Sequence, residues 1–268
     1  MYEEAPSAAV PGAVVWRARG TGSVVVPDGC MDLLWVGGRL LVAGPDTGPH
    51  PAGEVPGGAF AGLRLAPGTA PALLGVPAHE LRDRRVELAG LWPGAEVRRL
   101  TEGVGGYEDP REGLEELARV RAAAVGPPDR LVAEVADRLR AGESVAGIAA
   151  AVGLGERQLR RRSLDAFGYG PRTLGRVLRL QRALTLVRRG LPPARVAALA
   201  GYADQAHLTR EVRALAGTTP RAYAAGPEGA AGSEGDAGSE GDAGSEGDAG
   251  SEGANSEIPE PSGSSTTA

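Results

Sequence analysis

Between residues 129 and 225, apolar side chains recur at helical spacing, and glycine or proline interrupts the pattern at intervals of roughly ten to twenty residues. Apolar residues three and four positions apart line one face of a helix, so each uninterrupted stretch predicts a short amphipathic helix. Seven such helices fit into this segment. Because short helices bury their apolar faces only against one another, we expect an all-α domain here.

Two parts of this segment repeat one pattern. In the first, Ser144 is placed to cap a helix, Gly153 to end it, and Glu156 to begin a second helix. The second helix buries Leu159 and Phe167 on one face and carries arginines on the other. Two helices joined by a tight turn, with long donors exposed on the second, form a helix-turn-helix whose second helix fits the DNA major groove.

The second copy follows at residues 193–212, where Gly201 ends the first helix and Asp204 caps the next. Between the copies, residues 171–189 predict a connecting helix of about 28 Å. This length approaches the roughly 34 Å that separates successive major grooves on one side of a duplex. The spacing predicts that one molecule reads two adjacent grooves of double-stranded DNA.

These residues resemble the DNA-binding region of the AraC family of bacterial regulators, in which a helix joins two helix-turn-helix units. The resemblance covers residues 129–225 and includes Ile148-Ala149, Arg179-Leu180 and Gly201-Tyr202. It implies a sequence-specific regulator that binds promoter DNA. The base-reading positions that it implies are Arg157, Arg160 and Arg161 in the first unit and Gln205, Ala206, Thr209 and Arg210 in the second, with Gln158 and Arg162 beside them on the DNA-binding surface.

The sequence departs from the family at a few positions. Phenylalanine is usual where this chain has Ser163, Leu208 and Val212, so we expect looser packing, most clearly in the first unit. Ala206 is too short to hydrogen-bond a base, so we expect the second unit to discriminate sequence weakly.

Charge divides the chain at the same places. Residues 129–225 hold 17 arginines and eight acids, residues 1–128 hold 12 arginines and 16 acids, and residues 226–268 hold ten acids and no base. The chain contains no lysine, so the abundance of arginine does not by itself indicate bidentate recognition. A basic segment between acidic ones is expected where one segment meets DNA phosphates.

Residues 1–125 have the pattern of a β-rich mixed domain. Residues 31–36 and 39–43 predict a hairpin that turns at Gly37-Gly38, and alternation over residues 61–65 predicts another strand. Helical patterns follow at residues 70–74, 78–84 and 111–125. Strands followed by helices place the chain in the α+β class, with an all-α double helix-turn-helix domain at residues 129–225.

The N-terminal region resembles, through residues 27–33 and 65–68, a sensor-type domain that precedes the DNA-binding region in some family members.

A single cysteine, Cys30, excludes an internal disulfide and fits a reducing cytoplasm. A small buried hydrophobe is the favoured role of Cys30, with a redox or alkylation sensor left open. Asp28 is favoured as a turn former, with catalysis together with Asp32 as the alternative. His50 and His79 stand alone, so we expect no metal and no cofactor.

From residue 226 onward the chain consists mainly of glycine, serine, alanine and acids, and it repeats Ala-Gly-Ser-Glu-Gly-Asp. Burial of so little apolar surface cannot offset the conformational entropy that the segment would lose on folding. We therefore expect residues 226–268 to form a disordered acidic tail. The sequence has no run of about 18 apolar residues and begins with no signal-like segment. We therefore expect a cytoplasmic protein without a membrane partner.

These patterns favour a regulator that is not an enzyme and that an effector or a partner controls through the N-terminal domain. Its effector is not identified by the sequence, and RNA polymerase and a second copy of the chain are further partners consistent with such a role. The alternative is an enzyme in the N-terminal domain with the helical region as an adaptor. That alternative requires a nucleophile with a base, or a metal cluster, which the sequence pattern does not offer.

Overall fold

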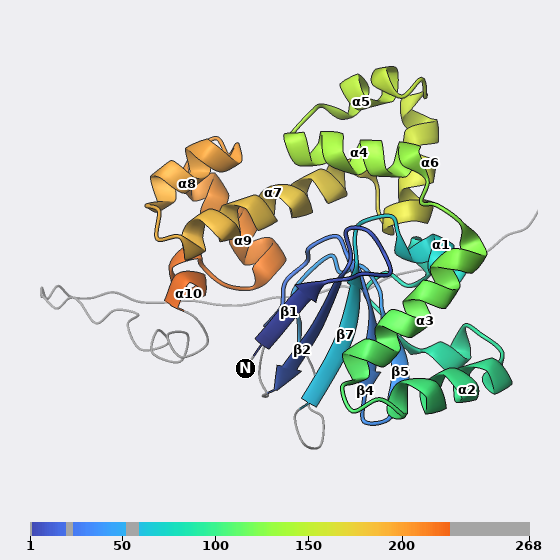
Figure 1. Cartoon of the computed structure of the whole chain (residues 1–268). Coiled ribbons are helices and arrows are strands. Elements are labelled where there is room, and N and C mark those ends of the chain that lie inside the picture. The colour runs from blue at the N-terminus through green and yellow to red at the C-terminus, as the bar shows by residue number, and fades with distance from the viewer. Residues whose placement is uncertain (1, 20–23, 52–58, 226–268) are drawn as a thin grey trace, which may run out of the picture. The chain divides into compact units, whose positions relative to one another are not determined.

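A six-stranded antiparallel sheet organises the N-terminal part of the computed structural model, which describes residues 2–19, 24–51 and 59–225 (Figure 1). The strands follow one another across the sheet in the order β1-β2-β7-β4-β5-β8. Their bounds are β1 (Tyr2–Pro6), β2 (Val14–Arg19), β4 (Met31–Val36), β5 (Arg39–Ala43), β7 (Ala59–Leu65) and β8 (Arg85–Glu87). Two short strands, β3 (Val24–Val25) and β6 (His50–Pro51), pair separately.

The predicted hairpin is confirmed, since β4 and β5 pair through a turn at Gly37 and Gly38. These two glycines have φ angles of 55° and 79°. Successive positive φ angles belong to the tight turn that matches the twist of an antiparallel hairpin, which is why two glycines stand there. The predicted strand at residues 61–65 is part of β7, a central strand of the sheet.

One face of the sheet forms the N-terminal hydrophobic core. Val15, Leu63, Leu33 and Val42 lie opposite one another in register on four neighbouring strands, and all four are buried. Two helices, α2 (Gly94–Gly105) and α3 (Pro110–Val125), bury apolar side chains against this core. Alternation along each strand therefore gives the sheet one face buried under helices.

Two other elements of this region differ from the helices predicted from the sequence. The predicted helix at residues 78–84 is wrong, because only a short 3-10 turn, η1 (Ala78–Glu80), forms there. Asp83 adopts a φ of 56°, which a right-handed helix excludes, and its side chain accepts hydrogen bonds from Thr47. The helix α2 was not predicted from the sequence, because its glycines are poor helix formers. The remaining elements are α1 (Ala70–Leu74) and η2 (Leu88–Gly90).

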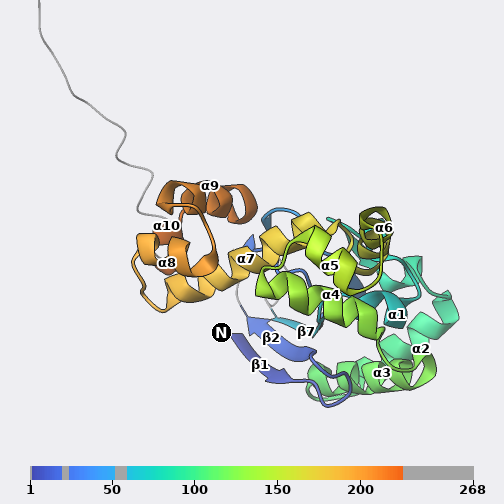
Figure 2. The same ribbon diagram turned by 90° about the horizontal axis from the view of Figure 1, so that it is seen from above.

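All of residues 129–225 are described, and they form the seven helices that the sequence predicts. These are α4 (Arg130–Ala141), α5 (Val145–Ala151), α6 (Glu156–Phe167), α7 (Pro171–Arg188), α8 (Pro193–Ala200), α9 (Gln205–Ala216) and α10 (Pro220–Ala225). The long helix α7 runs from the group α4–α6 to the group α8–α9 (Figure 2). It contributes Leu174 and Leu178 to a hydrophobic core shared with α4–α6, and Leu180 and Leu184 to a separate core shared with α8 and α9. One helix thus belongs to both units.

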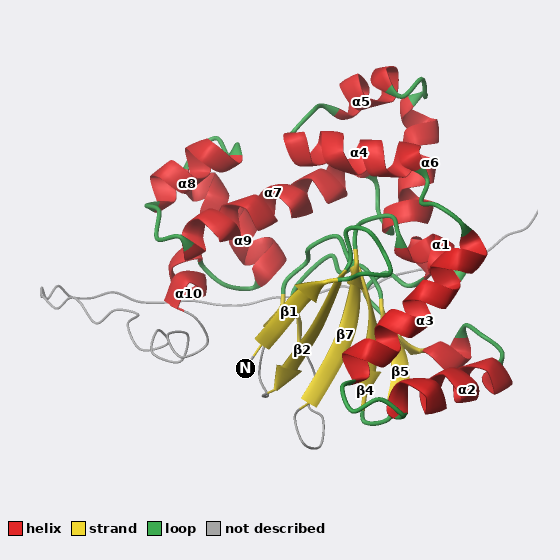
Figure 3. Cartoon of the chain, in the orientation of Figure 1, coloured by secondary structure: helices red, strands yellow, loops and turns green. Residues whose placement is uncertain are grey.

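The distribution of helices and strands confirms the α+β class, with the strands confined to the N-terminal part and helices alone after it (Figure 3). Among the described residues, no helix is both long and apolar enough to cross a membrane. The expected acidic tail at residues 226–268 lies outside the described residues. The domain limits at residues 125 and 129 stay predictions.

Candidate nucleic-acid interface

The first helix-turn-helix unit is built from α5, a turn and α6. Ser144 caps α5 as predicted, because its Oγ accepts a hydrogen bond from the backbone N–H of Gly147 at 3.1 Å. The chain turns at Gly153, where φ is 66°. On the inner face of α6, Leu159 is fully buried and Phe167 nearly so. These contacts hold α6 on the unit and direct its opposite face outward.

The outer face of α6 carries a concentrated positive charge. Its exposed guanidinium groups make no hydrogen bond or ion pair within the described part of the chain, and they belong to Arg157, Arg160, Arg161 and Arg162. Four unpaired positive charges within two helical turns repel one another and attract a polyanion. Arginine suits such a ligand, because its planar fork binds phosphates and guanine edges bidentately.

Gln158 has a second task at the start of α6. Its side-chain Oε1 accepts a hydrogen bond from the backbone N–H of Gly155 at 3.1 Å, which satisfies one of the free donors at the helix start. The residue is exposed, and this hydrogen bond uses its Oε1 as the acceptor. Its amide NH₂ can therefore donate to DNA while Oε1 holds the helix end.

The second unit is built from α8, a turn and α9. Asp204 caps α9 as predicted, since its Oδ1 accepts a hydrogen bond from the backbone N–H of His207 at 2.6 Å. The turn contains Gly201 with a φ of 79°. The fully buried Leu208 and Val212 fix the inner face of α9.

The outer face of α9 has fewer free polar groups than that of α6. Gln205 and Arg210 are exposed, whereas the hydroxyl of Thr209 donates to the backbone carbonyl of Gln205 at 2.9 Å. Ala206 is exposed and offers only a methyl group. Weaker sequence discrimination by the second unit stays a prediction. The side chains of α9 that are free to contact bases are mainly those of Gln205 and Arg210.

All three positions at which phenylalanine is usual in the resembling family are buried. Leu208 and Val212 are fully enclosed, and Ser163 on α6 is 1% exposed. The Oγ of Ser163 has no hydrogen-bond partner in the described part of the chain. A buried hydroxyl without a partner destabilises the first unit, the one in which we expected the looser packing.

An ion pair that was not predicted from the sequence joins α9 to α7. Arg176 donates from Nε and Nη2 to the two carboxylate oxygens of Glu211, at 3.0 and 2.9 Å. These hydrogen bonds lower the pKa of Glu211. Glu211 is the sole acidic residue of α9, a signal that could have pointed to a partner among the arginines of α7.

The N-terminal candidates of the sequence analysis lie together on β4 and the turn before it. Asp28 acts as a turn former, as favoured, since its Oδ1 accepts from the backbone N–H of Cys30 at 2.8 Å. Arg64 lies between Asp28 and Asp32, with its Nε 3.4 Å from an oxygen of each. One guanidinium thus partly neutralises both carboxylates.

Two pKa shifts describe the chemistry of this group. Burial, together with the negative charges of Asp28 and Asp32, raises the pKa of the Cys30 thiol well above its ordinary value. A thiol held in its protonated form is a poor nucleophile, which favours a structural role over sensing. Burial also raises the pKa of Asp32 to about 6, although Arg64 opposes that change.

The two isolated histidines lie in different surroundings. His79 lies 3.4 Å from Asp165 of α6, and His50 is part of β6. Among the described residues, no three histidine, cysteine, aspartate or glutamate side chains lie close enough together to hold a metal ion.

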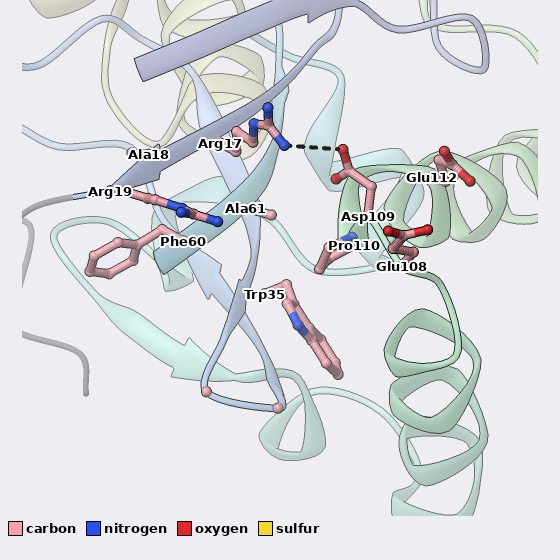
Figure 4. Close-up of a pocket in the computed structure, with 12 residues that line it drawn as sticks. Arg17, Ala18, Arg19, Trp35, Phe60, Ala61, Glu108, Asp109, Pro110 and Glu112 are labelled. Atoms are coloured by element: carbon pink, nitrogen blue, oxygen red, sulfur yellow. Dashed lines mark ion pairs between the residues drawn. The ribbon is translucent and has the colours of Figure 1, made fainter. Parts of the chain in front are cut away.

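A hollow that the sequence did not predict opens at one end of the N-terminal sheet (Figure 4). It has a volume of about 720 Å³. Arg17 of β2 faces Asp109, the residue before α3, across a separation of 3.7 Å, and Trp35 lies below them. Further lining side chains are Arg19, Phe60, Glu108 and Glu112. The hollow therefore offers both charges and an aromatic ring to a small molecule.

Comparison with known families supports the assignment of the helical part. A family model described as "Helix-turn-helix domain" matches residues 130–226, and one described as "Domain of unknown function (DUF6597)" matches residues 13–87. None of the curated proteins matches this sequence significantly.

Similar solved structures include those of ToxT from Vibrio cholerae. ToxT of strain O395 is 10% identical, with a TM-score of 0.41 over 79% of this chain and 96% of ToxT. An apo variant from strain SCE256 is 9% identical, with a TM-score of 0.42 over 84% and 92% of the two chains. Wild-type ToxT of that strain, bound to an unsaturated fatty acid, is 10% identical, with a TM-score of 0.41 over 78% and 92%. These values are too low to carry the properties of ToxT over to this chain.

The matched residues 130–226 contain both helix-turn-helix units and the helix that joins them. The unpaired arginines of α6 lie within this range. Residues 130–225 therefore form a helix-turn-helix domain of the AraC type, and the chain is a DNA-binding transcription regulator.

Proposed function

We propose that α6 and α9 enter two successive major grooves of promoter DNA. In the first groove Arg157, Arg160 and Arg161 contact base edges, while Gln158 and Arg162 contact the flanking backbone. The contacts in the second groove come from Gln205, Ala206, Thr209 and Arg210. The connecting helix α7 has 18 residues, hence a length of about 27 Å, which suits two units on one side of a duplex.

The observation that carries this proposal is the row of unpaired guanidinium groups on α6. Elsewhere in the described part of the chain many arginines are paired, among them Arg85 with Asp46 and Arg111 with Asp109. Leaving four arginines together without partners costs free energy in the isolated protein. Binding to DNA removes that cost, because phosphates and guanine edges supply the missing acceptors.

Selection of bound sequences from a random DNA pool by the full chain tests this reading. We expect one asymmetric site with two half-contacts about one helical turn apart and no palindrome. Arg161→Ala should weaken binding to that site by about 1–3 kcal/mol and relax the preference at one or two base positions.

A matched control is Arg99→Ala, which removes an exposed arginine from α2, outside the helix-turn-helix domain. It should leave both affinity and preference nearly unchanged. If Arg161→Ala instead weakens binding to all sequences equally, that arginine contacts phosphate and does not read bases.

Insertions between the half-contacts test whether both units bind. Five inserted base pairs turn the second groove to the opposite side of the duplex, so the affinity should fall to that of one unit. Ten inserted pairs restore the direction but add roughly 34 Å, which α7 cannot span. Equal binding to all three sites would mean that a single unit reads DNA, and the second unit, with Ala206, is then the silent one.

The N-terminal domain supplies the regulatory input in this proposal, and no catalytic step is required. The hollow suits a small zwitterion, whose anionic group meets the arginine side of the lining, whose cationic group meets the acidic side at Glu108 and Glu112, and whose apolar part lies on Trp35. A second copy of the chain and RNA polymerase are further partners consistent with such a regulator.

Calorimetric titration of the full chain with the free amino acids as probes tests the effector site. An amino acid that binds the wild type should bind Trp35→Ala at least about tenfold more weakly, because the ring provides the apolar wall. Equal binding by both proteins would place the effector site elsewhere.

A further inference from the structure

We propose that Glu211 is a positioning residue that holds the recognition helix α9 at a fixed angle to α7 and thereby makes the chain strict about the spacing between its two half-sites. This inference rests on the proposed reading of two grooves. It concerns a residue outside the predicted DNA-contacting set and gives it a role in specificity.

The contact geometry is that of a two-point clamp. Both side-chain oxygens of Glu211 accept from Arg176, at 3.0 and 2.9 Å, and Nη2 of Arg179 lies 3.9 Å from the same carboxylate. A bidentate pair between a guanidinium and a carboxylate fixes direction as well as distance, because both groups are planar. The side chain of Glu211 is 16% exposed and that of Arg176 is 43% exposed, so the carboxylate end of the pair is the one shielded from water.

Arg179 adds a second anchor at the turn before α9. Its guanidinium lies over the ring of Tyr202, 4.7 Å from the ring centroid, and its Nη1 donates to the carbonyl of Gly201 at 3.4 Å. Tyr202 is buried, and its ring is nearly perpendicular to that of His207, with 5.3 Å between the ring centroids. The start and the middle of α9 are therefore both tied to one face of α7.

The clamp leaves the DNA-reading face of α9 open. Successive residues of a helix are turned by about 100°, so Gln205 and Thr209 lie roughly 120° or more around the helix from Glu211, and Arg210 lies about 100° from it. Glu211 points to α7 while those residues point outward. A carboxylate in this position orients the helix, and it is also too far around it to accept from a base in the groove.

The first unit has no counterpart of this clamp. Among the described residues, no ion pair joins α6 to α7, and apolar side chains such as Leu159 and Leu174 hold the two helices in one core. Apolar contacts tolerate small rotations better than a bidentate ion pair does, because only the pair depends on direction. The angle between α9 and α7 is thus fixed by a polar contact, whereas the angle between α6 and α7 depends on apolar contacts.

The test measures the affinity of the full chain for its selected DNA site and for versions with one base pair removed, one added and two added between the half-contacts. One base pair rotates the second groove by about 34°. We expect the wild type to lose about tenfold in affinity for each single-pair change. Glu211→Gln and Arg176→Gln should weaken binding to the optimal site by several-fold and reduce the tenfold difference to about threefold or less.

Three controls separate positioning from folding and from direct contact. Glu134→Ala removes a pair of 2.9 Å with Arg138 within α4, and it should keep the strict spacing. A DNA carrying only the second half-site should bind wild type and Glu211→Gln equally, because the residue does not touch DNA. The double variant of Glu211 and Arg176 should be no worse than either single variant, as a shared interaction requires.

Equal loss of affinity at every spacing, or an unchanged spacing preference in Glu211→Gln, would overturn the inference while leaving two-groove reading intact. A wild type with no spacing preference would instead overturn the proposed function, and this inference with it. The thermal midpoints of the variants, measured in parallel, identify any variant that does not fold, and Arg176→Gln then provides the same test from the other side of the pair.

Discussion

Replacing Asp32 by asparagine should remove a pH dependence from the folding stability between about pH 4 and pH 6. Asp32 lies on β4, accepts from Nε1 of Trp16 at 2.7 Å and is 16% exposed. Burial raises its pKa to about 6, whereas an aspartate of the unfolded chain has a pKa of about 3.9. The folded protein thus holds this proton more tightly than the unfolded chain does.

The sign and the size of the effect follow from this difference. Protonation of Asp32 contributes stability that is fully present below about pH 4 and is lost as the pH rises through about 6. A shift of about two units corresponds to at most roughly 3 kcal/mol, and partial exposure to water makes about 1–3 kcal/mol the expected range. Asparagine keeps the shape and can still accept from Trp16, but it has no proton to lose. Relative to the wild type, Asp32→Asn should therefore become more stable by this amount between pH 4 and pH 8.

Urea unfolding of both proteins at a series of pH values, followed by tryptophan fluorescence, gives the required free energies. Glu116→Gln is the matched control, because Arg119 lowers the pKa of that exposed glutamate and reverses the expected direction. A stability difference between Asp32→Asn and wild type that stays constant with pH, or that changes the opposite way, would refute the reasoning.

Three further predictions follow from burial and charge. Ser163→Ala should raise the free energy of unfolding by about 1 kcal/mol, because it removes a buried hydroxyl without a partner. A lower free energy of unfolding for the variant, measured with urea, would mean that the hydroxyl has a hydrogen-bond partner. Gly62→Ala should lower it by about 1–3 kcal/mol, because a Cβ would lie 2.4 Å from the ring of Trp16, and an unchanged midpoint would show that the ring moves aside freely. Ending the chain at residue 225 removes ten acids and should strengthen DNA binding at low salt while changing little at high salt; the same gain at both salt concentrations would contradict an electrostatic cause.

Local patterns were sufficient for the helical half of the chain. Caps such as Ser144 and Asp204, and glycines that end helices, act on backbone groups within a few residues of themselves. Apolar spacing of three and four residues defines a buried face without reference to the rest of the fold. The sequence by itself therefore determined both helix-turn-helix units, the connecting helix and the arginine face of α6.

Contacts between residues far apart in the chain decided the rest. The order of the six strands brings β2 and β7 together across about forty residues, and no local pattern encodes such a pairing. The clamp of Arg176 and Glu211 joins residues 35 positions apart, and the hollow needs Arg17 and Asp109 at one end of the sheet. Many arginines of the helical part could have paired with Glu211, and only the packing of α9 on α7 selected Arg176, because an ion pair depends on distance and direction that the tertiary fold alone sets.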